Sequence, residues 1–503
     1  MGLYIYRKKL YTIIIINSYL LIVLSGILTI PLIYSIILQE SKTTSLAFLL
    51  AILIAFVPGI FMKYHYKFFS KKKNLNLNIS TSMMAVSCAW ILSSFIGAIP
   101  LFFGLELTLI DALFEGVSAF TTTDFTTLKN FDLIPKSLLL WRALMQWLGG
   151  LGILTFFLLI STRFAGNMWQ LFSAESHKVN SSRPVPNISN TIKILWTIYI
   201  LFTIIQSILL FIFKVPLFDA VIHSLTSIST GGFSHYENSI GHYALTGHPY
   251  YRQIEYIIIA FMLLGGINFL LHYKVLTGNF KAPLQNTEFK AFIKIIAFTT
   301  LLIMLAIILN NKEHLKDLEN LFRTVLFQVV SILTTAGYET QEISSSFFPV
   351  VARQAFLILM LIGGSVGSTS GGVKVLRIVI LKRLFSREIK KTYYPPHSVL
   401  PVTLDQNIID TEEIYRIATM LFAWVLVIVC GGLISSFFSN MDAFQSLSVM
   451  FSAVGNIGPH YGDPNMADLA PVLKLTYMIA MLAGRLEILP LFILFSKNTW
   501  KSQ

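Results

Sequence analysis

The sequence is poor in charged residues. Asp, Glu, Lys and Arg make up 13% of its 503 residues, whereas soluble proteins carry about 25%. Hydrophobic residues make up 55%, and the mean hydropathy is +0.69. This composition excludes a soluble globular protein and a disordered one. It also argues against a nucleic-acid partner despite the net charge of +13, because such proteins display basic residues on a polar surface that this chain mostly lacks.

Cysteine is also scarce. Only Cys88 and Cys430 occur, and both lie in apolar runs. A disulfide framework and a cysteine-rich metal site are therefore excluded, and we expect two small buried hydrophobic side chains. No covalently bound cofactor is expected.

Apolar stretches long enough to cross a bilayer, about 20 residues each, are abundant. The first follows Arg7, Lys8 and Lys9 and is too long for a signal peptide, so we interpret it as a retained span. The ten candidate spans are 10–38, 44–62, 82–104, 137–160, 190–213, 252–272, 291–310, 350–380, 411–438 and 470–496.

The positive charge is distributed unevenly between the connections. Alternate connections hold 26 of the 38 Lys and Arg residues but only seven of the 25 acidic residues, so the rest of the chain is net negative. Because basic residues concentrate in cytoplasmic loops, both termini are assigned to the cytoplasm, with membrane lipid as a partner of the basic loops. These connections are 1–10, 63–80, 161–193, 271–294, 374–416 and 497–503.

On the opposite side, one unit recurs four times. A short half-apolar segment, too short to cross the membrane, leads into a tract rich in Gly, Ser and Thr. The tracts align at Asp124, Gly232, Gly337 and Gly458, although Gly455 is an alternative in the fourth. We divide the chain into two leading spans with a basic loop (1–80) and four pore repeats (81–188, 189–282, 283–400 and 401–503).

Non-helical backbone at membrane depth must be buried in protein or line a water-filled cavity. Four tracts on one side would converge on an axis, where backbone carbonyls replace the hydration shell of a cation. Asp111, Asp219 and Asp442 begin the half-apolar segments, and we expect them to cap half-helices. The predicted filter, where K⁺ would bind, comprises Thr122, Thr123, Asp124, Thr230, Gly231, Gly232, Thr335, Ala336, Gly337, Asn456, Ile457 and Gly458.

These motifs resemble the Trk/Ktr/HKT superfamily of potassium transporters. The resemblance rests on segments 229–234 (STGGFS), 335–338 (TAGY), 456–459 (NIGP), 363–374 (GGSVGSTSGGVK) and 483–488 (AGRLEI). It implies an all-α integral membrane protein, with two N-terminal spans and four span/pore-helix/span repeats around a pseudo-fourfold pore. It further implies a homodimer in the cytoplasmic (inner) membrane and, in bacteria, a cytoplasmic nucleotide-binding regulatory ring of the RCK type.

The segment 363–374 interrupts a predicted span, and the resemblance implies a gate beneath the filter; a packing kink is the alternative. Arg485 lies inside the last span, where an unpaired charge costs at least about 2.5 kcal/mol. By resemblance it is an electrostatic barrier below the filter, and the alternative is an ion pair with another span. The predicted gate residues are Gly363, Gly364, Gly367, Ser368, Thr369, Ser370, Gly371, Gly372 and Arg485.

Asp124 departs from the superfamily, which has glycine, or serine in many plant members, at this position. Its carboxylate either faces the pore, strengthening cation binding and weakening K⁺/Na⁺ discrimination, or turns away to bind nearby N–H groups. The leading hypothesis is potassium uptake, and the alternative is a Na⁺-preferring or Na⁺-coupled transporter of the same fold. An enzyme is disfavoured, because no nucleophile–base pair, metal cluster or paired acid occurs in the spans. Five histidines near the outer side lack metal-ligand spacing, and we expect them at the membrane interface: His223, His235, His242, His248 and His460.

Overall fold

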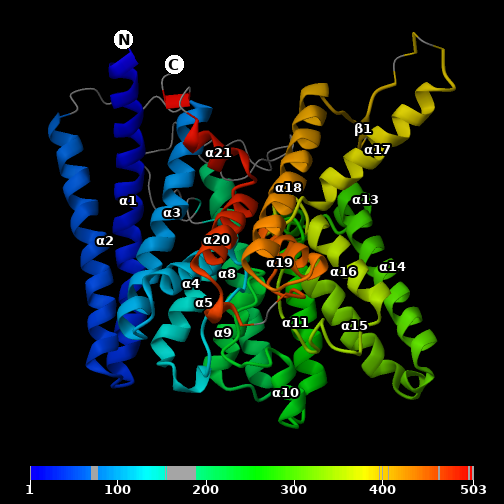
Figure 1. The fold of residues 1–503 in the computed structure, drawn as a ribbon, viewed down its shortest axis with the longest axis horizontal. Helices are drawn as coiled ribbons and strands as arrows, with labels where there is room; N and C mark the ends of the chain where they lie inside the picture. Colours follow the sequence, from blue (N-terminus) through cyan, green and yellow to red (C-terminus); the bar gives the residue numbers. More distant parts are fainter. Residues whose placement is uncertain are drawn as a thin grey trace.

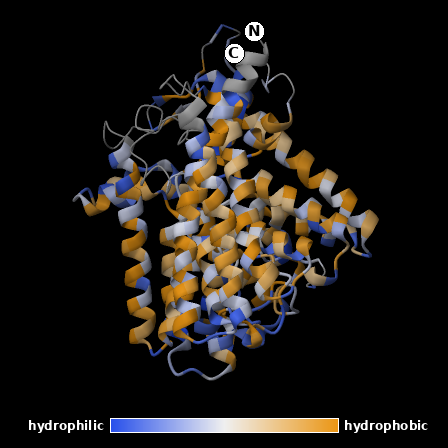
Figure 2. Cartoon of the chain, turned by 90° about the vertical axis from the view of Figure 1, so that its left-hand side faces the viewer, coloured by the Kyte–Doolittle hydropathy of each residue, from blue (hydrophilic) through white to orange (hydrophobic). Residues whose placement is uncertain are grey.

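The computed structural model describes residues 2–69, 78–152, 155, 188–395, 397–398, 400–405, 407–462, 465–496 and 499–500. Within these residues the structure is all-α apart from one two-stranded hairpin. Both termini lie at the same end of the molecule (Figure 1). Hydrophobic residues run along the helices and hydrophilic residues gather at the two ends, which suits a protein that crosses a bilayer (Figure 2).

The helices follow the predicted order of two leading spans and four repeats. The leading pair is α1 (Gly2–Ile37) and α2 (Lys42–Phe69). The first repeat contains α3 (Ile79–Gly104), α4 (Leu109–Thr121), η1 (Phe131–Leu133) and α5 (Lys136–Leu151). The second contains α8 (Ile188–Ile212), α9 (Leu217–Ile228), α10 (Gly241–Leu245), α11 (Tyr251–Gly266), α12 (Phe269–Leu276) and α13 (Ala282–Gln285).

The third repeat contains α14 (Thr287–Asn310), η3 (Lys312–Asp317), α15 (Leu318–Leu333), α16 (Val350–Ile362) and α17 (Val375–Lys391). The fourth begins with the antiparallel hairpin of β1 (Thr403–Leu404) and β2 (Asn407–Ile408). Its helices are α18 (Thr411–Phe438), α19 (Ala443–Gly455), η4 (Met466–Asp468), α20 (Pro471–Arg485) and α21 (Leu489–Phe495).

Two predicted continuous spans are broken, and that part of the prediction is wrong. The span 252–272 bends by 102° between α11 and α12, and the span 470–496 bends by 119° between α20 and α21. At the first break Asn268 caps α12, accepting a hydrogen bond from the Leu270 N–H at 2.9 Å. At the second, Glu487 and Ile488 adopt positive φ angles of 57° and 66°. Hydropathy runs through both breaks, so the sequence pattern concealed them. Part of the predicted span 137–160 lies outside the described residues.

The four short pore helices α4, α9, α15 and α19 pack in a cyclic arrangement. Each contacts both neighbouring helices of its own repeat. Each also contacts the second long helix of the preceding repeat: α9 packs on α5, α15 on α11, α19 on α16, and α4 on α20. This cyclic packing brings the C-terminal ends of the four pore helices together.

Only one of the three acidic residues that we expected to cap a pore helix is an N-cap. Asp442 is the N-cap of α19 and forms a capping box with Gln445. In α4 the N-cap is Thr108, so Asp111 lies in the first turn, and Asp219 likewise lies in the first turn of α9. The capping prediction is therefore wrong for these two acids, whose carboxylates bind side chains instead.

The two cysteines also differ from expectation. Cys88 in α3 is half-buried, whereas Cys430 lies exposed on α18. In a membrane an exposed apolar face meets lipid, so a small hydrophobic side chain needs no protein neighbour there.

Candidate functional site

The four tracts after the pore helices repeat one backbone conformation. Their first residues are left-handed, with φ of 56° at Thr122, 51° at Thr230, 57° at Thr335 and 55° at Asn456. Their third residues are positive as well, and these φ angles are 67° at Asp124, 83° at Gly232, 85° at Gly337 and 111° at Gly458. Because Gly455 is still helical, the backbone equivalent of Gly232 and Gly337 is Gly458.

In three of the tracts the third residue lies against the second residue of the next, and the Asp124 carboxylate of the first tract lies against Gly232 of the second. A Cβ atom placed on Gly232 would collide with the Ala336 carbonyl oxygen, and one on Gly337 with the Ile457 carbonyl oxygen. A Cβ on Gly458 would lie 3.2 Å from the Thr123 carbonyl oxygen, which returns to the first repeat. The four tracts therefore form a closed ring.

The Asp124 carboxylate points into this ring. Its Oδ2 atom lies 2.7 Å from the position of a Cβ on Gly232, and 3.1 Å from those on Gly337 and on Gly458. One oxygen thus neighbours all three other repeats, which places it near the axis that they share. Among the hydrogen bonds and ion pairs of the described residues, none involves the Asp124 side chain.

Side chains from neighbouring repeats hold the tracts in place. Gln146 of α5 donates to the Gly231 carbonyl at 2.6 Å and accepts from the Phe233 N–H at 3.1 Å. Asn456 donates to Thr123 Oγ1 and to the Met481 carbonyl, both at 2.9 Å. Each amide links two repeats, so the ring is braced from outside.

A cavity of about 270 Å³ lies on the outer side of the ring. Acidic side chains outnumber basic ones in its lining, and the one guanidinium there is paired with a buried acid. Cations would accumulate in such a vestibule. Its acidic residues are Asp124, Glu237, Glu339 and Glu342.

The predicted gate segment lies directly beneath the ring. Thr369 Oγ1 donates to the Ile228 carbonyl at 3.0 Å, and the Thr230 hydroxyl donates to Thr369 Oγ1 at 3.2 Å. The Gly371 N–H donates to Thr335 Oγ1 at 2.7 Å. The segment between α16 and α17 therefore touches two tracts through hydroxyl groups.

Three of the gate glycines take backbone conformations that side chains rarely adopt. The φ angles of Gly363, Gly367 and Gly372 are 73°, 77° and 78°. A Cβ on Gly371 would also collide with the Gly455 carbonyl oxygen. The segment is therefore non-helical and tightly packed. The remaining predicted gate residues Gly364, Ser368 and Ser370 lie in the same segment.

Arg485 joins this segment to the first repeat. Its guanidinium donates to the Thr369 carbonyl at 2.8 Å, to the Gly150 carbonyl at 2.7 Å and to the Gly149 carbonyl. The last two carbonyls end α5, where a cation is favoured by the helix dipole. Arg485 also lines a cavity together with Ser370 and Gly371. Its guanidinium therefore places a positive charge beneath the ring.

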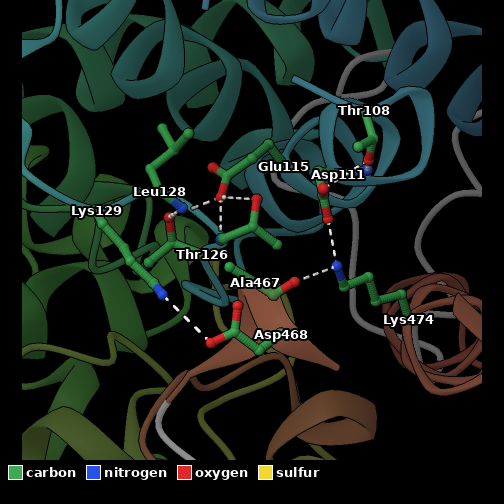
Figure 3. A network of polar contacts seen from close by, with 10 residues as sticks. Thr108, Asp111, Glu115, Thr126, Leu128, Lys129, Ala467, Asp468 and Lys474 are labelled. Atoms are coloured by element: carbon green, nitrogen blue, oxygen red, sulfur yellow. Dashed lines mark hydrogen bonds and ion pairs between the residues drawn. The ribbon is translucent and has the colours of Figure 1, made fainter. Parts of the chain in front are cut away.

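Buried charged pairs around the pore helices were not foreseen from the sequence. Glu115 of α4 and Arg142 of α5 lie 3.1 Å apart, with 0% and 2% of their side chains exposed. Glu115 also accepts from the Thr126 hydroxyl at 2.6 Å, just after the first tract (Figure 3). Asp111–Lys474 and Glu255–Arg323 are comparable pairs, and Asp219 Oδ1 lies 3.1 Å from His235 Nε2. None of these partners stands at the spacing of one helical turn, so the sequence spacing carried no signal.

Replacement of Arg142 by methionine tests the contribution of the first pair. The Glu115 carboxylate would be left buried without its cation, so we expect the free energy of unfolding to fall by about 3–5 kcal/mol. Denaturant unfolding in detergent measures this change. Asp468→Asn is the control, because its exposed pair with Lys129 is worth at most about 1 kcal/mol. Equal losses in the two variants would contradict the prediction.

Glu288 is a second residue that the sequence interpretation missed. It lies in the first turn of α14 with 4% of its surface exposed. Its Oε1 atom accepts from the Val366 N–H at 2.7 Å and the Leu376 N–H at 3.3 Å. One carboxylate thus ties both ends of the gate segment to a span. An acid in the first turn is also typical of an ordinary helix start, which hid this role.

The histidines only partly follow the expectation of an interfacial position. His223 in α9 is fully buried, and neither ring nitrogen has a hydrogen-bond partner in the described part of the chain. That prediction is wrong for His223. His242 in α10 stacks on Tyr236 with ring centroids 3.6 Å apart, and burial lowers its pKa.

Comparison with known proteins gives consistent matches. A family model described as a cation transport protein, TrkH, matches residues 49–502. An uncharacterized cation transporter of Methanocaldococcus jannaschii is 34% identical over 493 residues, covering 95% of this chain and 94% of its own. The Trk system potassium uptake protein TrkH of Escherichia coli is 30% identical over 488 residues, covering 96% and 97%. The crystal structure of the potassium transporter TrkH from Vibrio parahaemolyticus superimposes with a TM-score of 0.84 at 27% identity, covering 98% of this chain and 99% of that one.

Proposed function

Because the chain belongs to the TrkH family of cation transport proteins, we propose that it carries potassium ions across a membrane along the axis of its four-tract ring. Its family consists of transporters and not of enzymes. The repeated backbone conformation of the four tracts is the observation that carries the proposal. A ring of equivalent backbone segments supplies carbonyl oxygens from every side, which is how a filter replaces the hydration shell of K⁺.

The ion path in this proposal has three stages. Cations collect in the acidic vestibule, lose their water in the ring formed by the tracts at Asp124, Gly232, Gly337 and Gly458, and then meet the gate segment. The gate segment and Arg485 hold the path closed until the segment moves. The contacts of Thr369 with Thr230 and of Gly371 with Thr335 support this arrangement, because they join the segment to two of the tracts that it would uncover.

Uptake of K⁺ and Rb⁺ by purified protein in liposomes tests the function. We expect both ions to enter under an inside-negative potential. Expression in a K⁺-uptake-deficient host should restore growth at limiting K⁺. Absence of both uptake and growth with a folded, membrane-inserted protein would refute the proposal.

A second candidate is a Na⁺-preferring or Na⁺-coupled transporter of the same fold. The position of the Asp124 carboxylate near the ring axis favours it, since a carboxylate oxygen attracts a small cation more strongly than a carbonyl does. We expect Asp124→Gly to raise the ratio of K⁺ to Na⁺ uptake by about tenfold. Asp132→Asn removes an exposed charge near the same vestibule and should leave the ratio unchanged. An unchanged ratio in Asp124→Gly would mean that the carboxylate does not contribute to selectivity.

The assembly and orientation of the protein belong to the same proposal. Both termini face the cytoplasm in the inner membrane, two copies form a homodimer, and a nucleotide-binding regulatory ring docks on the cytoplasmic end. The relatives' names, which describe parts of a Trk system, support an assembly with partners. The exposed basic residues of α17 support a cytoplasmic position for its end.

A further inference from the structure

We propose that Asp124 and the carbonyl oxygens of the adjoining tracts form a calcium-binding site at the outer face of the ring, and that Ca²⁺ bound there blocks the entry of monovalent cations. The inference rests on the proposed transport function. It concerns a second ion, however, and can be tested by binding as well as by transport.

The site combines one carboxylate with backbone oxygens from three repeats. The point where a Cβ atom of Gly232 would lie is 2.7 Å from Asp124 Oδ2 and is also close to the Ala336 carbonyl oxygen. The Cβ position of Gly337 is likewise shared by Asp124 Oδ2 and the Ile457 carbonyl oxygen. The carboxylate and these carbonyl oxygens therefore surround the same small space.

The same arrangement continues to the first repeat. The Cβ position of Gly458 lies 3.1 Å from Asp124 Oδ2 and 3.2 Å from the Thr123 carbonyl oxygen. With three carbonyl oxygens and a carboxylate near one axis, the site offers only hard oxygen ligands. Ca²⁺ prefers such ligands, six to eight of them and often including water, in an irregular geometry.

The carboxylate is not neutralised by another side chain. The nearby cation is Arg142, which is 2% exposed and hydrogen-bonds through Nε to Glu115 and through Nη2 to Thr126. In the described part of the chain no hydrogen bond or ion pair holds the Asp124 carboxylate. It is therefore available to an ion that enters the vestibule.

The vestibule would concentrate divalent ions. Glu237, Glu339 and Glu342 line it together with Asp124.

The described residues contain no group of three or more His, Cys, Asp or Glu side chains that could hold a metal ion. A site must therefore draw most of its ligands from the backbone, as this ring does.

Binding at this position would stop conduction because the path is narrow. A conducted ion must bind weakly enough to leave. A carboxylate attracts a divalent ion about twice as strongly as a monovalent one at the same distance. Ca²⁺ would therefore remain bound at the entrance and prevent K⁺ from entering the ring. Mg²⁺ loses its water reluctantly and should block less well.

Rb⁺ uptake into proteoliposomes at increasing external Ca²⁺, from micromolar to millimolar, tests the inference. We expect half-maximal block of the unmodified protein at a Ca²⁺ concentration at least about a hundredfold lower than that of Asp124→Gly. Asp124→Asn, which keeps the shape of the side chain, should behave like Asp124→Gly. Asp132→Asn should match the unmodified protein, because it removes only a surface charge.

Equal Ca²⁺ sensitivity of the unmodified protein and Asp124→Gly would overturn the inference. An equal loss of sensitivity in Asp132→Asn would overturn it too, since surface screening would then be the cause. Binding of radioactive Ca²⁺ to the purified protein in detergent needs no transport, and we expect Asp124→Asn to abolish one bound ion per chain. If no variant takes up Rb⁺ without Ca²⁺ but this binding difference persists, the transport proposal fails and the calcium site stands. If the binding difference is absent, the calcium site fails.

Discussion

Replacement of Gly337 by serine is expected to reduce K⁺ uptake by at least about a hundredfold. Gly337 has a φ angle of 85°, and a Cβ atom there would collide with the Ile457 carbonyl oxygen of the next repeat. The added atom must displace that carbonyl, and a filter depends on the positions of its carbonyl oxygens. Rb⁺ flux in proteoliposomes measures the loss.

Gly247→Ser is the matched control for this experiment. Gly247 also has a positive φ angle, 70°, but a Cβ atom there would meet nothing within 4 Å. This variant carries the backbone strain without the collision, so its flux should stay within about twofold of the unmodified protein. If Gly337→Ser conducts normally while folded, the ring of tracts is not the ion path. If both variants lose flux equally, backbone strain and not the collision is the cause.

Replacement of Arg485 by glutamine is expected to raise the basal flux of K⁺ by about tenfold or more. The variant removes a positive charge from beneath the ring and releases the hydrogen bonds to the Thr369 and Gly150 carbonyls. The first change lowers the electrostatic barrier to a cation, and the second loosens the gate segment. Flux without any regulatory partner is the measurement.

Arg485→Lys separates the two effects. Lysine keeps the positive charge but lacks the planar guanidinium with which arginine reaches three carbonyl groups. If the charge is the barrier, Arg485→Lys should conduct like the unmodified protein. A rise in its K⁺ flux would show instead that the hydrogen bonds of Arg485 to the Thr369 and Gly150 carbonyls keep the path closed. Unchanged flux in Arg485→Gln, with the protein still folded, would contradict a role for Arg485 in closing the path.

Hydropathy did not predict all the breaks in the membrane-spanning helices. The break at 363–374 was visible, because five glycines fall within twelve residues. The breaks after Gly266 and Arg485 were not, because apolar residues continue on both sides. Local composition reports whether a residue suits a membrane but not the direction in which the helix continues.

The position of Asp124 shows the same limit at the candidate site. The sequence identified it as the departure from the repeat pattern and left its direction open. Its direction depends on Gly232, Gly337 and Gly458, which lack side chains and so leave room for the carboxylate near the axis. That room is created by three other repeats, each more than 100 residues away in the sequence.

The sequence by itself determined the all-α membrane class, the two leading spans, the four repeats and the positions at which their tracts align. These features are local or periodic: hydropathy, charge asymmetry and recurrence can all be read along one chain. Only the tertiary structure decided that the tracts close into a ring and that the Asp124 carboxylate points into it. It also decided that Glu115 pairs with Arg142 beside the first tract and that Glu288 holds the gate segment. Those features arise from contacts between distant segments, and such contacts depend on how the repeats pack around a common axis.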